Sequence, residues 1–299
     1  MTSHRAIDCW VNVTMGEAEP PEYLRRVKED YFKAGEEFFT SLSVDECLAD
    51  MDEAGVEKAI LTVRVKDPSE AVLDFTRQCP DRFALAAHVR PTAGLPELWR
   101  LQDLVAEHPV VMARVVPFDF DLPPSDAQYY PLYAKCVEMD LPLSVNTGLP
   151  GPPVPGECQD PIHLDRICYR FPLLRLCMAH GADPWWDTAM RLMLKYPNLH
   201  LMTSAYSPKY LPPEGVHFMN TRGARQDSLR QRPPCAVHET LYCRGRPARP
   251  QGRRTGQIPA GQRRTTLLRR PTSTARMNVV IARTHNRHGP AWARRNKRG

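Results

Sequence analysis

The stretch Ser43–Val63, SVDECLADMDEAGVEKAILTV, shows how the chain is built. Its first four residues form a capping box, in which Ser43 and Glu46 satisfy each other's backbone N–H groups, and this predicts the start of a helix. Gly55 predicts the helix end, because glycine readily adopts the left-handed backbone of a C-cap. Ala59–Val63 is an apolar run that predicts a buried strand. The stretch therefore encodes one helix followed directly by one strand.

The same alternation of buried strands and amphipathic helices extends in both directions from this stretch. The predicted strands cover residues 6–11, 59–63, 83–87, 110–116, 142–146, 174–179 and 199–202. Two predicted helices begin at Ser43 and at Pro68. The other predicted helices cover residues 95–107, 130–139, 162–169, 186–195 and 213–221. Strict alternation predicts a parallel sheet covered by helices. Seven such units, with no Gly-rich phosphate fingerprint after the first strand, favour a (β/α)8 TIM barrel over an open doubly wound sheet.

The predicted barrel is incomplete, because no eighth strand or closing helix is visible after residue 224. Residues 1–224 are the predicted barrel, and residues 225–299 are an Arg-rich tail. We expect the tail to be disordered, since it cannot bury enough apolar surface to offset its ordering entropy. The missing strand would leave the first and seventh strands with unpaired edges, which predicts poor solubility or association, including a homo-oligomer.

Charge is divided sharply along the chain. Residues 225–299 hold 18 Arg and one Lys against two acidic residues, a net charge of +17, whereas residues 1–224 carry −11. Such a preference for Arg over Lys is typical of GC-rich coding DNA read in a shifted frame. Codons chosen for residues 225–269 and read one nucleotide later can spell an apolar strand ending in an aspartate, followed by amphipathic helices. We therefore interpret the tail as an out-of-frame reading that begins after Ala224.

The alternative interpretation of the tail is a basic arm that binds nucleic acid through phosphates. Its only aromatic residues are Tyr242 and Trp292, which offer little for base stacking. The rest of the composition excludes other classes. No run approaches 18 apolar residues, so no membrane span is expected, and the polar N-terminus does not resemble a signal peptide. Nine cysteines without a CxxC pair indicate reduced thiols, and therefore a cytoplasmic protein.

Chemistry in a barrel of this kind is placed at the carboxyl ends of the strands. His180 ends an apolar strand and Asp183 follows three residues later, so the pair could bind a metal or transfer a proton, or His180 could be a structural histidine. Arg114 could bind a carboxylate or phosphate with two parallel hydrogen bonds, or form a structural ion pair. Asn146 could orient a ligand or satisfy the backbone of the following loop.

Several ordered segments of residues 1–224 resemble the amidohydrolase-related family, in the branch similar to aminocarboxymuconate-semialdehyde decarboxylase. The segments are Ile7–Asn12, Ser43–Leu61 with its DEAGVEKAIL, Pro142–Gly148, Leu176–Pro184 with LCMAHGADP, and Tyr196–Leu199. The resemblance implies a (β/α)8 barrel that binds a divalent metal, usually zinc, and hydrolyses or decarboxylates a small molecule. In that family a metal-activated water is the nucleophile. The family also has an aspartate at the end of its eighth strand.

The sequence departs from the family at the implied metal ligands. Trp10 and Asn12 stand where the family has His-x-His at the first strand end, and Asn146 stands where it has a histidine at the fifth. Only His180 keeps a ligand. Tryptophan cannot ligate and Asn is a poor zinc ligand, so the resemblance implies an altered metal site.

The candidate roles follow from both the resemblance and the departures. His180 is the candidate base and retained ligand, Asp183 is its orienting partner, and the substrate contacts are Arg114, Asn146, Asn12 and Trp10. Three functions remain open: a metal-dependent hydrolase of a small molecule, a decarboxylase on the same scaffold, and an inactive product of a disrupted reading frame.

Overall fold

The computed structural model describes residues 6–14, 22–32, 36–206, 210–225 and 279–280. Its strands form one parallel sheet in which each strand pairs with the next along the chain. The strands are β1 Ala6–Val11, β2 Val56–Arg64, β3 Phe83–His88, β4 Val110–Val115, β5 Leu143–Asn146, β6 Leu176–Ala179, β7 Leu199–Met202 and β8 Val279–Val280.

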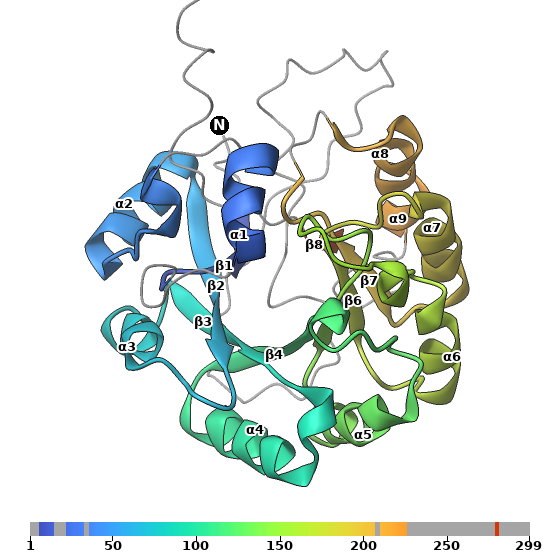
Figure 1. Ribbon diagram of the computed structural model, residues 1–299, viewed down its shortest axis with the longest axis horizontal. Helices are drawn as coiled ribbons and strands as arrows, with labels where there is room; N and C mark the ends of the chain where they lie inside the picture. Colours follow the sequence, from blue (N-terminus) through green and yellow to red (C-terminus); the bar gives the residue numbers. More distant parts are fainter. Residues whose placement is uncertain (1–5, 15–21, 33–35, 207–209, 226–278, 281–299) are drawn as a thin grey trace, which may run out of the picture.

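Most of the helices lie around the outside of the curled sheet, whereas the first helix lies within the ring that they form (Figure 1). The α-helices are α1 Glu22–Arg26, α2 Val44–Ala54, α3 Glu70–Gln78, α4 Leu95–Glu107, α5 Tyr130–Glu138, α6 His163–Arg170, α7 Trp186–Lys195, α8 Pro213–Met219 and α9 Arg222–Arg225. A π-helical turn, Val27–Phe32, follows α1. The 3-10 turns are Glu36–Phe39, Pro91–Ala93, Pro117–Asp119, Ala127–Tyr129 and Glu157–Gln159.

Helix α2 begins and ends where the sequence predicts. The Ser43 side chain accepts from the Glu46 backbone N–H while the Glu46 carboxylate accepts from the Ser43 backbone N–H, which is the predicted capping box. Gly55 closes the helix with a φ of 71°. The capping box and the left-handed glycine together confine the helix to eleven residues and pass the chain directly into β2.

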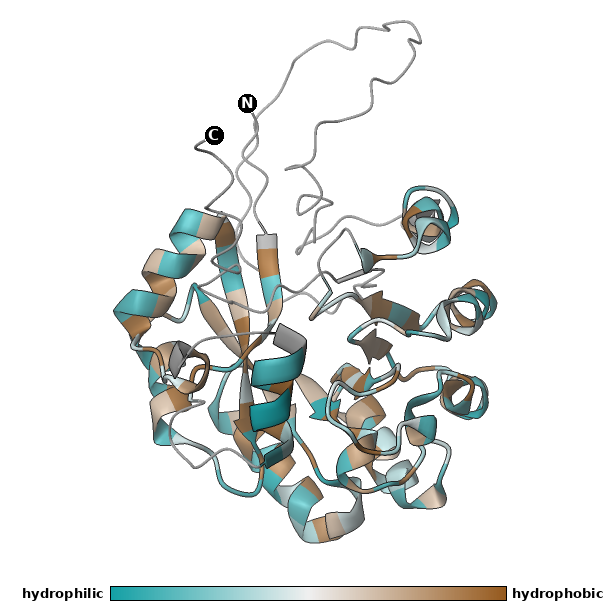
Figure 2. Cartoon of the chain, turned by 45° about the horizontal axis from the view of Figure 1, so that its top comes forward, coloured by the Kyte–Doolittle hydropathy of each residue, from teal (hydrophilic) through white to brown (hydrophobic). Residues whose placement is uncertain are grey.

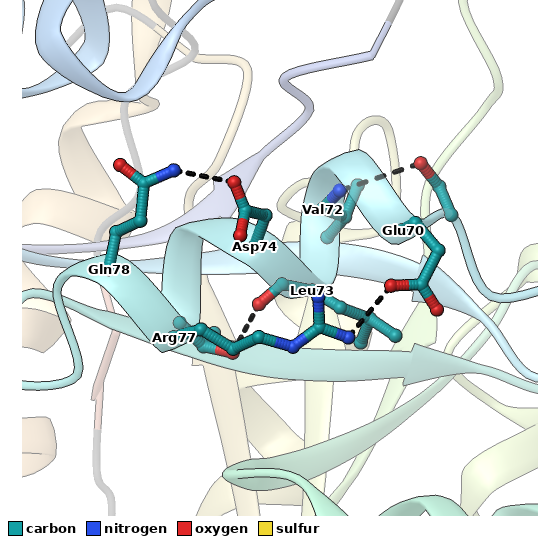
Figure 3. A network of polar contacts seen from close by, with 8 residues as sticks. Glu70, Val72, Leu73, Asp74, Arg77 and Gln78 are labelled. Carbon is teal, nitrogen blue, oxygen red and sulfur yellow. Dashed lines mark hydrogen bonds and ion pairs between the residues drawn. The ribbon is translucent and has the colours of Figure 1, made fainter.

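Helix α3 holds its own turns together through side-chain contacts (Figure 3). Ser69 caps the helix by accepting from the Val72 N–H, and Arg77 donates to Glu70 at 2.7 Å along the exposed face. The buried face carries Val72, Leu73 and Phe75. The sequence therefore separates a solvent face with charge pairs from an apolar face that packs on the sheet.

The core has two parts, because side chains of a strand alternate between the two faces of the sheet. The larger part lies between the sheet and the helices and includes Leu61, Leu85, Leu101 and Leu143. Figure 2 shows the apolar colour running along the strands beneath the mixed helices. The smaller part fills the barrel interior and consists of Cys9, Ile60, Ala86, Met112, Cys177, Ala179 and Met202.

The barrel is incomplete, as predicted. Strand β6 pairs with one edge of β7, and on its other edge only Val279 and Val280 of the described residues pair with it. No pair between β8 and β1 joins the described strands. The sequence did not predict this two-residue strand. Three predictions concern residues outside those described: the missing closing helix, the disorder of the tail, and the shifted reading frame of the tail. No helix among the described residues is both long and apolar enough to cross a membrane.

Candidate active site

The inward face of the sheet continues past the interior core toward the carboxyl ends of the strands. Thr62, His88 and Arg114 each lie two residues beyond an interior residue of β2, β3 or β4, so they share its face. On β5, Leu143 and Val145 belong to the outer core, which leaves Ser144 and Asn146 facing inward. On β2 to β5 the inward face therefore ends in Thr62, His88, Arg114, Ser144 and Asn146.

Arg114 is fully buried at the centre of this face. Its guanidinium donates to the Cys9 carbonyl of β1 at 2.8 Å and to the Thr62 hydroxyl of β2. The guanidinium carbon lies 3.4 Å from the centre of the Trp10 ring, in a cation–π arrangement. One side chain of β4 is therefore fixed by groups from β1 and β2.

Among the described residues no carboxylate forms an ion pair with Arg114 within 4.0 Å, and the buried carboxylate of Asp8 acts on it only from further away. Within the same residues its Nε–H also has no acceptor. Burial lowers the pKa of Arg114 from 12.5 to about 9, although Cys9, Cys177 and Asp8 act in the opposite direction. Since a pKa of about 9 is still above neutral pH, the guanidinium stays charged in the interior.

His180 lies at the end of β6 and is held by Ser204, the second residue after β7. Ser204 Oγ lies 2.9 Å from His180 Nδ1 and accepts from the His180 backbone N–H at 3.1 Å. The His180 ring centre is 4.1 Å from that of Trp10. Burial first, and then the charge of Arg114, lower the pKa of His180 to about 4. The ring is therefore neutral near pH 7 and can accept or share a proton.

The backbone at His180 has a φ of 64°, which is uncommon for a residue other than glycine. Gly181 follows with a φ of 70°, and a Cβ there would lie 2.6 Å from the Trp186 ring. Two left-handed residues in succession therefore make the sharp turn that aims the histidine. Residues held in such conformations cluster at functional sites.

Asp183 is placed differently from its predicted role. Its side chain is exposed and makes no hydrogen bond or ion pair with any residue that the structure describes. Its backbone carbonyl accepts from the Leu149 N–H at 2.7 Å. The turn at His180 and Gly181 carries Asp183 outward, and the group that contacts the imidazole is Ser204 instead. The sequence offered one signal for Ser204, its position just after the seventh strand.

The two asparagines at ligand positions differ in environment. Asn146 is 6% exposed, and its Oδ1 has no hydrogen-bond partner within the described part of the chain. Asn12 is exposed just after β1. Asn146 thus lies inside the site beside Arg114, whereas Asn12 lies at its outer edge.

The loops after β5 and β6 are joined at Gly148. Its N–H and carbonyl both bond to Gln159, and a Cβ at Gly148 would lie 3.1 Å from the backbone N and O of Asp183. Gly148 also has a φ of 85°. Only glycine combines this backbone conformation with so close an approach, so it fixes the wall of the site beside Asn146.

An acid–base pair that the sequence did not predict lies on the same face. His88 Nε2 is 3.6 Å from Asp119 Oδ2, which follows β4 in a 3-10 turn. Burial lowers the pKa of His88 to about 4, with the charges of Arg114 and Arg64 acting in the same direction, and burial raises the pKa of Asp119 to about 6. Alternation along β3 indicates the inward position of His88, but nothing in the sequence points to Asp119.

The residues present do not fit the divalent metal that the resemblance implies. The first-strand positions carry an indole and a carboxamide, and Nδ1 of His180 is engaged by Ser204. Among the described residues, no group of three His, Cys, Asp or Glu side chains converges at a point where it could hold a metal ion. One imidazole is too small a donor set for a zinc site, which uses three or four ligands from the protein.

The chain was compared with known proteins. The family model described as amidohydrolase matches residues 7–226. No curated protein matches the chain. Among solved structures, an uncharacterized TIM-barrel protein from Bordetella bronchiseptica has a TM-score of 0.58 at 23% identity, covering 72% of this chain and 80% of its own. A 5-carboxyvanillate decarboxylase from Sphingomonas paucimobilis has a TM-score of 0.52 at 14% identity, covering 68% and 81%.

The two solved structures show a similarity of fold, since both identities are below 25%. The family model extends from β1 to α9 and so includes the carboxyl ends of β1 to β7. It matches the same part of the chain that carries the alternating strands and helices. The chain therefore belongs to the amidohydrolase family of enzymes.

Proposed function

We propose that this protein is an amidohydrolase-family hydrolase that acts on a small molecule bound at the carboxyl ends of β1, β4, β5 and β6. The observation that carries the proposal is the convergence on Trp10, whose ring contacts the Arg114 guanidinium at 3.4 Å and the His180 ring at 4.1 Å. A cation, a flat ring and a neutral imidazole thus come together from three strands. Such a set suits binding and proton transfer at one place.

His180 is the proposed proton acceptor. Its low pKa keeps the ring neutral, so it can take a proton from an attacking water without first losing one. Ser204 fixes the ring orientation through Nδ1. A positioned general base contributes a rate factor of up to about 10²–10⁴, most when its pKa lies near the working pH, and the pKa of His180 lies below neutral pH. Asp183 is exposed at the loop entrance, where it is proposed to meet substrate rather than to orient the ring.

Arg114, Asn146, Asn12 and Trp10 are the proposed substrate contacts. Arg114 supplies positive charge from the interior, and Asn146 supplies a buried carboxamide without a partner among the described residues. Trp10 offers an apolar face, and Asn12 lies where a substrate would enter. Divalent metal dependence, which the resemblance implies, is not part of the proposed mechanism because the donor set does not fit it.

Decarboxylation on the same scaffold is the second candidate function. It is supported by the buried positive charge of Arg114, which would hold a carboxylate against the Trp10 ring. The similar structure from Sphingomonas paucimobilis is described as a decarboxylase. The third candidate is a catalytically inactive product. We also propose a cytoplasmic location, supported by the thiols of the seven described cysteines, all of which are free.

The test is turnover by the purified full-length chain on esters, lactones, amides and aromatic carboxylic acids. Acid release without CO2 would identify a hydrolase, and CO2 release would identify a decarboxylase. His180→Asn should abolish either activity, whereas His217→Asn, on the exposed face of α8, should leave it unchanged. Absence of turnover on every class would contradict both enzymatic proposals and favour the inactive product.

A further inference from the structure

We infer that the resident cation of this site is the Arg114 guanidinium rather than a divalent metal ion, and that a bound anion completes it on the inward face of β4 and β5. The inference rests on the proposed function and names the charge of the ligand which that site takes. It goes beyond the family resemblance, which implies a metal at this place.

The first argument is the charge of Arg114, which no described anion contacts: the buried Asp8 carboxylate raises the pKa of Arg114 but lies beyond 4.0 Å of the guanidinium. The side chain is 0% exposed, and its three described partners are a carbonyl, a hydroxyl and an aromatic ring, none of which carries a negative charge. A buried charge without a counter-ion costs several kcal/mol, so buried ions are normally paired. The nearby thiols of Cys9 and Cys177 are not counter-ions, because burial raises the pKa of both and keeps them protonated.

The second argument is a row of buried polar groups that have no partner among the described residues. They are Arg114 Nε on β4, and Ser144 Oγ and the Asn146 side-chain oxygen on β5. Arg114 and Ser144 are register partners on adjacent strands, and Asn146 follows two residues later on the same face. Ser144 is 0% exposed and Asn146 is 6% exposed. Buried polar groups are almost always hydrogen-bonded, so three unpaired groups side by side indicate a ligand.

The chemistry of these three polar groups favours an anionic ligand. The guanidinium N–H and the serine hydroxyl are donors, and the Asn146 carboxamide presents its NH2 donor after a flip of the amide, which exchanges its two ends. Donors beside a positive charge complement a carboxylate, and such charge-assisted hydrogen bonds are about twice as strong as neutral ones. The same row repels a metal cation and offers it no thiolate, imidazole or carboxylate.

The position of Trp10 also favours an anion over a metal ion. Its ring contacts both the guanidinium and the His180 imidazole, so an indole lies beside the only retained ligand of the family's metal site. A metal at His180 would also have to displace the Ser204 hydroxyl from Nδ1 or be bound through Nε2 alone. The positive charge at the strand ends therefore comes from a side chain of β4 that is fixed by groups from β1 and β2.

The experiment uses the full-length protein and measures anion and metal binding separately from turnover. Benzoate and its neutral isostere benzamide are compared by isothermal titration calorimetry, and Zn2+ and Mn2+ by equilibrium dialysis. We expect benzoate to bind at least about tenfold more tightly than benzamide, a difference of about 1.4 kcal/mol. We expect bound metal far below one ion per chain, unchanged in His180→Asn.

Three variants test whether benzoate binds at Arg114 and Ser144. Arg114→Gln should remove the preference for benzoate, whereas Arg64→Gln, which removes an exposed charge at the end of β2, should keep it. Since Arg114→Gln could fail to fold, Ser144→Ala serves as the second variant. It should weaken benzoate about five- to tenfold and leave the thermal midpoint of the ligand-free protein unchanged, because the hydroxyl has no partner to lose.

Stoichiometric zinc that is lost in His180→Asn overturns the inference, as does equal affinity for benzoate and benzamide or no binding of either. Retention of benzoate binding by Ser144→Ala also contradicts it. Anion binding without turnover leaves the inference standing and counts against the proposed function. Turnover that depends on an added metal would contradict the inference and leave the proposed enzymatic function standing.

Discussion

The Arg114 guanidinium stacks on the Trp10 ring, with its central carbon 3.4 Å from the ring centre. This contact joins the middle of the sheet to its first strand, because Arg114 belongs to β4 and Trp10 to β1. The same ring also packs on His180 of the β6 end. Trp10 therefore connects a cation and a base that are 66 positions apart along the chain.

Trp10→Ala should destabilise the fold and loosen Arg114. The lost cation–π contact is worth about 0.5–2 kcal/mol, to which the lost ring packing adds. Trp10→Phe should recover part of this. The measurement is the free energy of unfolding in urea. Trp99→Phe is the control, since Trp99 is 58% exposed on α4, and an equal effect in both variants would contradict the stacking.

His180→Asn and Ser204→Ala should separate catalysis from positioning. Asn keeps a polar group at the position of Nδ1, so the contact with Ser204 can persist while proton transfer is lost. We expect kcat to fall by about 10²–10⁴ with KM little changed. Ser204→Ala should lower kcat less and shift the pH profile, because the ring loses its fixed orientation. A change confined to KM would place Ser204 in binding instead.

His88 and Asp119 should oppose each other in the pH dependence of stability. The pKa of His88 is lowered from 6.5 to about 4, so stability falls as pH drops between these values. The pKa of Asp119 is raised from 3.8 to about 6, so stability rises as pH drops between 6 and 3.8. In the wild type the two effects largely cancel.

Asp119→Asn removes one side of this balance. The free energy of unfolding should then fall by up to about 1.4 kcal/mol for each pH unit from 6 to 4, relative to the wild type. His88→Gln should give the opposite slope. Urea unfolding at several pH values measures both, and parallel curves for all three proteins would contradict the shifts.

Gly148→Ala should destabilise the site wall. The new Cβ would lie 3.1 Å from the Asp183 backbone, at a φ of 85° that side chains rarely adopt. We expect a loss of about 1–3 kcal/mol in the free energy of unfolding. Gly151→Ala is the matched control in the same loop, where the nearest atom lies 4.0 Å away. It should be neutral.

We propose that the reading frame changes after Ala224. Sequencing of the coding DNA across residues 223–227, together with the intact mass of the native protein, should reveal a single-nucleotide difference and a mass other than 34.0 kDa. Agreement of both with the 299-residue sequence would remove the proposal. The basic arm would then be tested directly by the salt dependence of nucleic-acid binding.

The elements of the barrel were predictable because each depends on local signals. The capping box at Ser43 and the glycine at position 55 define α2, and α4, α7, β1 and β7 have the predicted bounds. Helix α1 was not predicted, since EYLRR is short and has no buried residue. The two-residue β8 carries too little pattern to be recognised.

The site was predictable by position but not by partner. Strand ends indicate His180, Arg114 and Asn146, whereas the contacts that define their chemistry come from other strands. Ser204 reaches His180 across 24 residues, and the Cys9 carbonyl reaches Arg114 across 105. Such pairings depend on register and turn geometry. The expected link between His180 and Asp183 assumed that neighbours in sequence stay neighbours in space.

The order of the strands in the sheet is also their order along the chain. Each parallel pair from β1 to β7 can therefore form once the later of its two strands has left the ribosome, without any strand further along the chain. The six pairings among β1–β7 use no residue beyond Met202. These seven strands can thus assemble in order during synthesis without any residue of the Arg-rich tail.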